Sequence, residues 1–393
     1  MATGESKSSS FLGTFAVVLL AIGALFVVDS FLARTERSES DAEAARLFEE
    51  GQHLRQEGRS EDAVHQFQAA LSIARGNRDY HIALASALLE AGKLTNAESA
   101  LSDLLQQNST DGEVNLLMAR VLLKQGRIPE AVSYYHRAIY GQWKQDPAGN
   151  RARTRFELVD LLARQNSKEE LLAELLPLQE EAPRDLDKQK DTQERIGRLF
   201  LAAGSPARAA EVFRDVLQNS GDDPQARAGL AEAEFAQGNY RAAEADYLAA
   251  ARLKPDDDAD RKRAEVSRQV LELDPMQRGI GPAERYRRSA KLLEMALDAA
   301  SQCAASRPPG SQDQASQNLA SQNQASQNQA SEELTAAAKK ALNRRVNSSA
   351  QNDAFEDNLD MAEKLWQIRN KECVQPAPEA YEPLALVLAK VAQ

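Results

Sequence analysis

The sequence predicts an all-α protein in which helical hairpins stack into a solenoid. Strong helix formers (Ala, Leu, Glu, Gln and Arg) dominate the 393 residues, and runs of β-branched residues are scarce outside the N-terminus. A glycine also recurs at a fixed interval. Gly58, Gly92 and Gly126 are 34 residues apart, and so are Gly204 and Gly238. The same sequence pattern is therefore repeated along the chain.

Each of these glycines has the same companions: a small residue seven positions before it, an alanine five after it, and a large apolar residue four further on. The three sets are Gly51, Ala85, Ala119, Gly197 and Ala231; Ala63, Ala97, Ala131, Ala209 and Ala243; and Phe67, Leu101, Tyr135, Phe213 and Tyr247. Glycine suits a left-handed residue after a first helix. The small residues let two helices approach closely, and the large residue fills the space beside them. One hairpin cannot bury its apolar face alone, so hairpins must stack.

This pattern resembles the tetratricopeptide repeat, a family that prefers small residues where its two helices meet, an aromatic residue or Leu beside them, and Pro near the end. The first repeat, 44–77, carries Leu47, Gly51, Leu54, Ala63, Phe67 and Ala70, and the last, 224–257, carries Ala231, Ala243, Tyr247, Ala250 and Pro255. The resemblance covers residues 44–257. It implies a right-handed α-solenoid of about six repeats that binds other proteins.

The fourth repeat, about 152–185, is degenerate. Asn166 stands where a glycine is expected, and Leu171 replaces the expected alanine. Asn also tolerates the left-handed conformation. Extra residues fall in 140–150 and 180–189. Trp143, in the first of these insertions, is either an exposed anchor for a partner or a cover on a neighbouring repeat.

Other segments surround the repeats. The predicted organisation is a short tail at 1–10, a transmembrane anchor at 11–33, a linker at 34–43, capping helices at 258–306, a disordered Gln/Ser/Asn-rich linker at 307–331 and C-terminal helices at 332–393. The disordered linker is expected because its polar, low-complexity composition cannot bury a core. The C-terminal helices are expected to fold back onto the end of the solenoid.

The anchor prediction depends on FLGTFAVVLLAIGALFVV at 11–28, a run without charge. A membrane crossing needs about 20 apolar residues. The alternatives are a cleaved signal peptide and a buried core helix. A single N-terminal anchor after only ten residues favours a single-pass membrane protein with residues 34–393 outside the cytoplasm, in the periplasm. The flanking charges are too few for the positive-inside rule to decide.

The two cysteines, Cys303 and Cys373, flank the low-complexity tract. Outside the cytoplasm a lone pair of cysteines is a disulfide candidate. The alternative is two unpaired thiols in the core.

Catalytic and metal-binding motifs are missing from the sequence. The four histidines form no HExxH pair, Gly279 and Gly281 lack a third glycine and a preceding strand, and there is no GxSxG. The net charge of −11 argues against nucleic-acid binding. We therefore expect neither an enzyme nor a protein with a metal, another cofactor or a small-molecule substrate.

In the tetratricopeptide repeat family the first helix of each repeat lines a concave groove. Carried onto this sequence, the resemblance implies groove positions at Phe48, Gln52, Arg55, Ile82, Ser86, Leu89, Leu116, Arg120, Leu123, Lys124, Phe156, Arg198, Leu201 and Phe235. Arg120, Lys124, Arg153 and Arg164 suggest a partner with acidic and apolar side chains, unless this basic bias is chance. Phe48 and Gln52 replace the carboxylate clamp of chaperone-tail-binding members, so that ligand is not supported.

The function predicted from these features is a membrane-tethered scaffold. It would bind a peptide or protein in its groove, in cell-envelope assembly, secretion or quality control. The alternative is a non-catalytic accessory subunit of an envelope enzyme system, such as polysaccharide assembly or cytochrome maturation.

Overall fold

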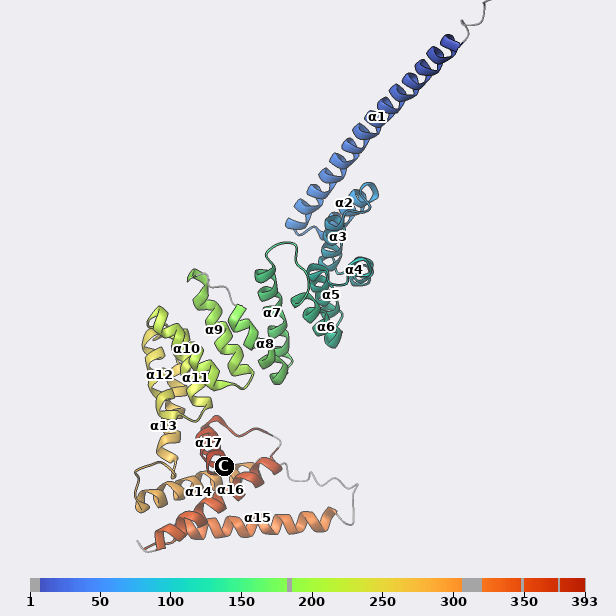
Figure 1. The fold of residues 1–393 in the computed structure, drawn as a ribbon. Coiled ribbons are helices and arrows are strands. Elements are labelled where there is room, and N and C mark those ends of the chain that lie inside the picture. Colours follow the sequence, from blue (N-terminus) through green and yellow to red (C-terminus); the bar gives the residue numbers. More distant parts are fainter. Residues whose placement is uncertain (1–7, 182–185, 306–319, 348–349, 374, 393) are drawn as a thin grey trace, which may run out of the picture. The chain divides into compact units, whose positions relative to one another are not determined.

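A computed structural model describes residues 8–181, 186–305, 320–347, 350–373 and 375–392, and the regular elements in these ranges are helices (Figure 1). The helices are α1 (Ser8–Gln56), α2 (Ser60–Ile73), α3 (Arg78–Glu90), α4 (Leu94–Gln107), α5 (Gly112–Lys124), α6 (Ile128–Ile139), α7 (Pro147–Arg164), α8 (Lys168–Glu181), α9 (Leu186–Ala202), α10 (Pro206–Ser220), α11 (Pro224–Ala236), α12 (Tyr240–Leu253), α13 (Ala259–Leu273), α14 (Pro282–Ala305), α15 (Ala320–Asn343), α16 (Gln351–Glu372), the 3-10 turn η2 (Glu379–Tyr381) and α17 (Glu382–Val391). The prediction of an all-α fold built from helical hairpins is confirmed.

The recurring glycines end the first helix of each hairpin. Gly58, Gly92, Gly126, Gly204 and Gly238 all have φ between 72° and 79°, the left-handed region. Asn166 takes the same place between α7 and α8 with φ 55°, so the degenerate repeat keeps the turn without glycine. The 34-residue spacing therefore reports the turns of the hairpins, as predicted.

The small residue before each turn is required by a neighbouring ring. A Cβ added to Gly51 would lie 2.6 Å from Cε1 of Phe67, and one added to Gly197 would lie 2.7 Å from Cζ of Phe213. Both phenylalanine side chains are fully buried. The pairing of a small residue on the first helix with a large one on the second is thus the packing contact inside the hairpin.

The chain divides into two compact units. The first contains residues up to Gln165 together with Leu176–Pro183, and the second contains Asn166–Leu175 and residues from Arg184 onward. In the first unit, successive helices from α1 to α7 pack against one another. Their core includes Phe67, Leu88, Leu101 and Leu122.

In the second unit, the core of the last repeat continues into the C-terminal helices. Tyr247 of α12 belongs to the same buried cluster as Leu292 of α14, Leu365 of α16 and Leu384 of α17. Arg263 of α13 donates to the Glu382 carboxylate at 2.7 Å, which ties α13 to the start of α17. The C-terminal helices thus fold onto the helices that follow the repeats.

Cys303 in α14 and Cys373 after α16 form a disulfide, with Cα atoms 6.1 Å apart. The same two helices pack along each other. Of the linker expected at 307–331, residues 306–319 lie outside the described residues. Residues 320–331 form the first half of α15 instead, since Ala and Gln favour helix.

The predicted transmembrane anchor at 11–33 and the single-pass membrane localisation are wrong, and the extracytoplasmic placement of residues 34–393, which depended on them, loses its support. Within the described residues, no helix combines the length and the apolar character that a membrane crossing requires. The uncharged run ends at Val28, and the charged Asp29 and the polar Ser30 follow within α1. Most side chains of 11–33 lie outside the described part. The expected cell-envelope role, which depended on this anchor, loses its support.

Candidate functional site

A cavity of about 430 Å³ lies in the first compact unit beside α1 and α3. Five of the predicted groove residues line it together: Phe48, Gln52, Arg55, Ile82 and Ser86. They come from two successive first helices, three or four residues (about one turn) apart on each. The register carried over from the repeat pattern therefore brings these five side chains to one surface.

The apolar part of the cavity is made by rings and an aliphatic side chain. The Phe48 ring stacks on Tyr80 with centroids 4.5 Å apart and packs at a tilt on Phe67 at 5.6 Å. Ile82 is 7% exposed and belongs to the core below. This packing holds the Phe48 ring in place because two neighbouring rings fix its orientation.

Gln52 and Ser86 supply uncharged polar groups. Both are partly exposed in the cavity, and neither side chain makes a hydrogen bond to the rest of the described chain. Their amide and hydroxyl groups can donate and accept. They are therefore available to a ligand.

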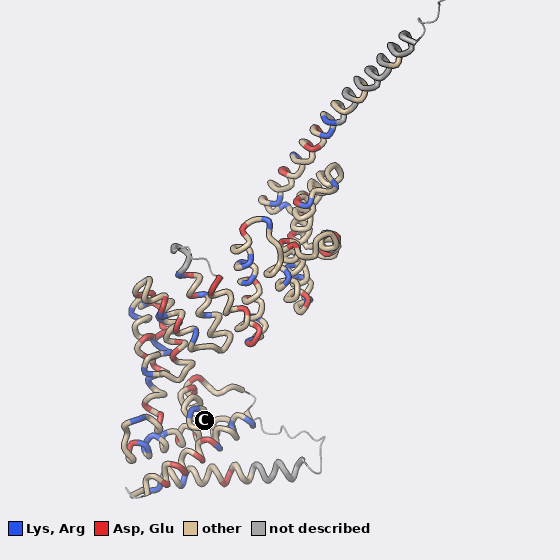
Figure 2. Tube along the Cα trace, viewed as in Figure 1, with Lys and Arg blue, Asp and Glu red and all other residues tan. Residues whose placement is uncertain are grey.

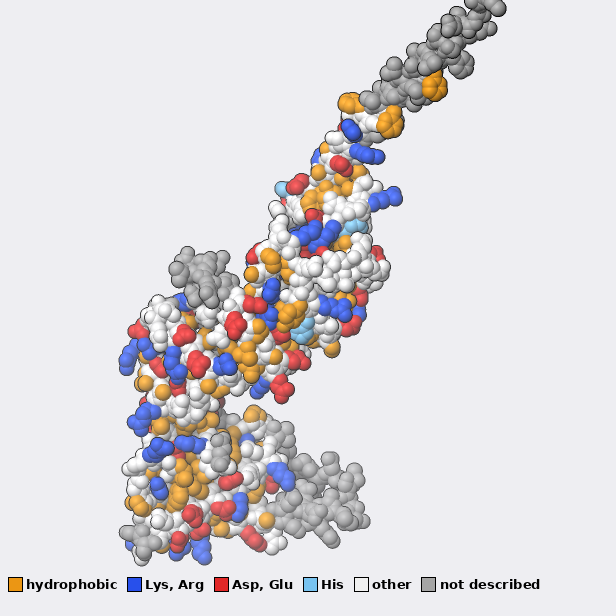
Figure 3. Space-filling view, viewed as in Figure 1, with side chains coloured by type: hydrophobic (Ala, Val, Ile, Leu, Met, Phe, Trp, Pro, Cys, Tyr) orange, Lys and Arg blue, Asp and Glu red, His pale blue; other side chains and the backbone are white. Residues whose placement is uncertain are grey.

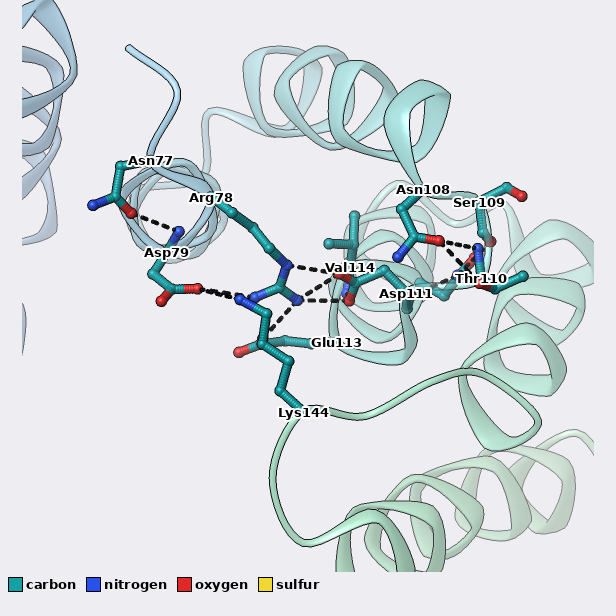
Figure 4. A network of polar contacts seen from close by, with 11 residues as sticks. Asn77, Arg78, Asp79, Asn108, Ser109, Thr110, Asp111, Glu113, Val114 and Lys144 are labelled. Atoms are coloured by element: carbon teal, nitrogen blue, oxygen red, sulfur yellow. Dashed lines mark hydrogen bonds and ion pairs between the residues drawn. The ribbon is translucent and has the colours of Figure 1, made fainter. Parts of the chain in front are cut away.

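Arg78, at the start of α3, holds one rim of the cavity (Figure 4). Its Nε donates to Asp111 Oδ2 and its Nη2 to Asp111 Oδ1, both at 2.7 Å. The same guanidinium reaches Glu113 at 3.1 Å and Asp79 at 3.0 Å. Burial by itself would lower the pKa of Arg78, but these carboxylates outweigh it and raise the pKa above its usual value.

Asp111 has two tasks in this network. Its Oδ1 also accepts from the backbone N–H of Val114 at 3.2 Å, so it caps the N-terminus of α5. Its side chain is 9% exposed. A carboxylate that is buried, capped and paired fixes the beginning of α5 relative to α3.

The insertion at 140–150 folds back over this junction. The backbone N–H of Gln142 donates to Thr110 O at 2.7 Å, and that of Gly112 donates to Gln142 O at 2.9 Å. Trp143 donates from Nε1 to Ala138 O at 2.9 Å and lies so close to Gly112 that a Cβ there would meet the indole at 2.5 Å. Trp143 thus covers a neighbouring repeat while its exposed part lines the cavity.

Lys144 completes the wall. Its Nζ donates to Asp79 Oδ1 at 3.3 Å, across the cavity rim (Figure 4). Burial would raise the pKa of Asp79, but the hydrogen bonds from Lys144 and Arg78 outweigh it and hold the pKa below its usual value. Asp79 is therefore charged at neutral pH and paired on two sides.

Arg120 and Lys124, two of the four basic residues that predicted an acidic partner, are bonded within the chain. Arg120 donates from Nε to Glu157 Oε2 at 3.0 Å, and the Tyr135 hydroxyl donates to the same oxygen at 3.2 Å. Lys124 donates to Leu89 O at 3.2 Å, at the C-terminal end of α3. Figure 2 shows Lys and Arg interleaved with Asp and Glu along the helices of this unit. Arg120 and Lys124 are therefore engaged within the chain rather than free for a partner.

The remaining predicted groove residues do not line the cavity. Leu89 and Leu116 are 8% and 9% exposed, and Leu123 packs against the core. Phe156 is partly buried on α7. Three residues belong to the second compact unit: Arg198, Leu201 and Phe235.

In that second unit Phe235 is covered. Its ring packs edge-on against Tyr240 at 5.1 Å, and the Arg263 guanidinium lies over it at 4.1 Å. Arg198 is exposed, with Glu194 at 3.7 Å. Leu201 is partly buried. Phe235 is 8% exposed and therefore offers a partner almost no surface.

Trp143 was singled out from the sequence, but other lining residues, among them Arg78, Asp79 and Lys144, were missed. Arg78 and Asp79 begin α3, just before the positions that the family pattern marks. The slip in the repeat phase after Gly126 was the one signal that pointed to Trp143 and Lys144. Within the described residues, no group of three His, Cys, Asp or Glu side chains could hold a metal ion.

Comparison with known proteins matches residues 54–121 and 88–140 to one family described as tetratricopeptide repeat, and residues 195–258 to another of the same description. These segments carry tetratricopeptide repeats. The tetratricopeptide repeat fold is that of a protein–protein interaction scaffold, generally without catalysis, and it supports binding of a protein or peptide partner.

Solved tetratricopeptide repeat structures resemble parts of the chain. YrrB, whose structure is described as having an unusual peptide-binding site, is 15% identical over 52% of this chain and 97% of its own, with a TM-score of 0.40. The C-terminal part of a repeat protein from Cytophaga hutchinsonii is 14% identical over 63% and 94%, with a TM-score of 0.43. Pseudomonas aeruginosa pilF is 21% identical over 55% and 97%, with a TM-score of 0.31. The comparison with curated proteins gave no match.

Proposed function

We propose that this protein is a non-catalytic scaffold that binds a protein or peptide partner in the cavity beside α1 and α3. The observation that supports this most is the meeting of Phe48, Gln52, Arg55, Ile82 and Ser86 in one cavity of about 430 Å³. A cavity of that size is within the range of binding pockets. It holds an apolar wall and polar groups without partners, which is what a peptide with a mixed surface requires.

The partner expected from the sequence was acidic and apolar. The apolar part keeps its support from Phe48 and Trp143, which line the cavity and are partly exposed. The acidic part depended on Arg120, Lys124, Arg153 and Arg164. Of these, Arg120 is bonded to Glu157, Lys124 to the Leu89 carbonyl and Arg153 to Asp146. A partner carboxylate would have to displace these contacts.

A position-specific crosslinking experiment tests the proposal. Peptides are selected from a displayed random library on the full chain, and a photo-crosslinking amino acid then replaces Gln52 on α1 or, as the matched control, Gln68 on α2. Gln68 is exposed and does not line the cavity. We expect the selected peptides to be captured from position 52 and not from position 68. Equal capture at both positions, or capture at 68 alone, would reject the cavity as the binding site.

A further inference from the structure

The charged groups around the cavity are neutralised inside the chain. Arg78 is bonded to Asp111 and Glu113, and Lys144 to Asp79. Arg55 has the Glu90 carboxylate at 3.6 Å. Figure 3 likewise shows side chains of both charges next to one another on the visible surface.

This pairing works against a charged ligand. A ligand carboxylate or ammonium group in the cavity would lose its water and find each counter-charge already engaged. Burying a charge without a partner is costly. If the ligand displaced one member of an existing ion pair, the displaced side chain of the protein would be left without its partner instead. Charge complementarity therefore favours a ligand segment without charge.

The uncharged polar groups of the cavity favour a ligand that can form hydrogen bonds. Gln52 and Ser86 have free hydrogen-bonding capacity on facing helices, α1 and α3. The main chain of an extended peptide presents N–H and C=O groups that need partners when they leave water. An amide and a hydroxyl can satisfy both kinds.

The apolar wall sets the side chains that fit. Phe48 of α1 and Trp143 of the insertion both line the cavity and are partly exposed, whereas Ile82 is 7% exposed and adds little surface. Trp143 is held by its bond to Ala138 and by Gly112, so its face is pre-positioned. An aliphatic or aromatic side chain in contact with both rings would bury apolar surface on each of them.

We infer that the partner presents an extended, uncharged polypeptide segment. Its main chain is hydrogen-bonded by Gln52 and Ser86, and an apolar side chain is held between Phe48 and Trp143. The inference rests on the proposed function and adds the chemistry of the partner. The insertion at 140–150 would then help to select the apolar side chain of the partner, because its Trp143 lines the cavity.

The test uses three libraries of acetylated, amidated 12-residue peptides and the full chain. In the neutral library Leu or Phe alternates with Ser, Thr or Gln, and in the two matched libraries a pair of the polar residues is Glu or Lys. Binding is measured by fluorescence anisotropy at two salt concentrations. The variant pair Gln52→Ala with Ser86→Ala is compared with the matched pair Gln68→Ala with Ser72→Ala on α2, with circular dichroism as the check on folding.

We expect the best neutral peptides to bind about tenfold more tightly than charged ones, with a Kd that salt changes less than about twofold. The cavity pair should weaken binding about tenfold, as expected for two lost hydrogen bonds, and the α2 pair should not. Tighter binding of an acidic or basic library with strong salt dependence overturns the inference and leaves the proposed function standing. No binding by any library, or binding that ignores both the cavity pair and Phe48→Ala, overturns both.

Discussion

Arg78 and Asp111, 33 residues apart, are joined by two parallel hydrogen bonds where consecutive helical hairpins meet. Lys190 and Asp223 repeat this relationship at the same spacing in the second compact unit. Asp223 caps α11 through the N–H groups of Gln225 and Ala226, as Asp111 caps α5. A cation at the start of one repeat therefore fixes the helix cap of the next, a contact that belongs to the array rather than to a single hairpin.

Arg78→Ala should destabilise the first compact unit by about 2–3 kcal/mol, because it leaves the nearly buried Asp111 carboxylate without its charged partner. The stability of Arg78→Lys should fall between those of the unmodified chain and of Arg78→Ala, since one ammonium group cannot replace the two parallel hydrogen bonds of a guanidinium. Urea unfolding followed by Trp143 fluorescence measures this, in a Trp366→Phe background that leaves one tryptophan.

The matched control is Arg59→Ala, which removes an ion pair with Asp62 in which both side chains are more than half exposed. It should cost less than about 0.5 kcal/mol. If both variants lost the same free energy of unfolding, the Arg78–Asp111 contact between repeats would stabilise the fold no more than an exposed ion pair does.

The Lys190–Asp223 pair predicts a pH dependence. Burial would raise the pKa of Asp223, but hydrogen bonds from Lys190 and from the backbone of Ala226 and Gln225 outweigh it and lower the pKa below 3.8. Because the folded pKa is the lower one, the carboxylate stabilises the fold above its unfolded pKa. That stability is lost as the pH falls from about 5 through the folded pKa.

Asp223→Asn should therefore make the thermal midpoint fall less steeply with acid over this range, and Lys190→Met should have the same effect. Circular dichroism melts of the full chain at pH steps between 6 and 3 measure both. Profiles as steep as that of the unmodified chain would contradict the assigned role.

Gly51→Ala should destabilise the first hairpin by about 1–3 kcal/mol, because the new methyl would overlap the Phe67 ring at 2.6 Å. Gly76→Ala, where nothing lies within 4 Å, is the control and should change stability by less than about 0.5 kcal/mol. Adding Phe67→Leu to Gly51→Ala should recover part of the loss. Additive effects in that double variant would argue against the contact.

Replacing Cys303 and Cys373 by Ser should lower stability by about 4 kcal/mol in the chain-entropy model, given their separation of 70 residues. Trp366 in α16 reports the unfolding of this region by fluorescence. A reducing agent should lower the midpoint of the unmodified chain and leave the double variant unchanged. Free thiols in the oxidised, unmodified chain, detected by mass spectrometry after alkylation, would rule the bond out.

The hairpins could be predicted from sequence because their constraints are local. A left-handed turn needs Gly58 or a tolerant residue such as Asn166, and a close helix contact needs Gly51 opposite Phe67. These requirements recur with the repeat and are visible as spacing. The degenerate fourth repeat was found in the same way.

The cavity was only partly predictable. Phe48 and Ser86 follow from the repeat register, but the insertion has no periodicity, so the approach of Trp143 and Lys144 to α3 depends on how a loop folds. Phe235 has the register of a groove residue, yet Arg263 from outside the repeats covers it. Arg120 was counted as a free cation because Glu157 lies in the next repeat, across the phase slip.

The two backbone hydrogen bonds between Gln142 and the Thr110–Gly112 segment join the beginning of α5 to the end of α6. Repeat arrays normally fray from their termini, because the outermost hairpin has a neighbour on one side only. Here the α5–α6 hairpin is closed on itself, so it should resist unravelling even when it is made terminal. A truncation after residue 146 would keep that closure, and one after residue 139 would leave α6 to peel away.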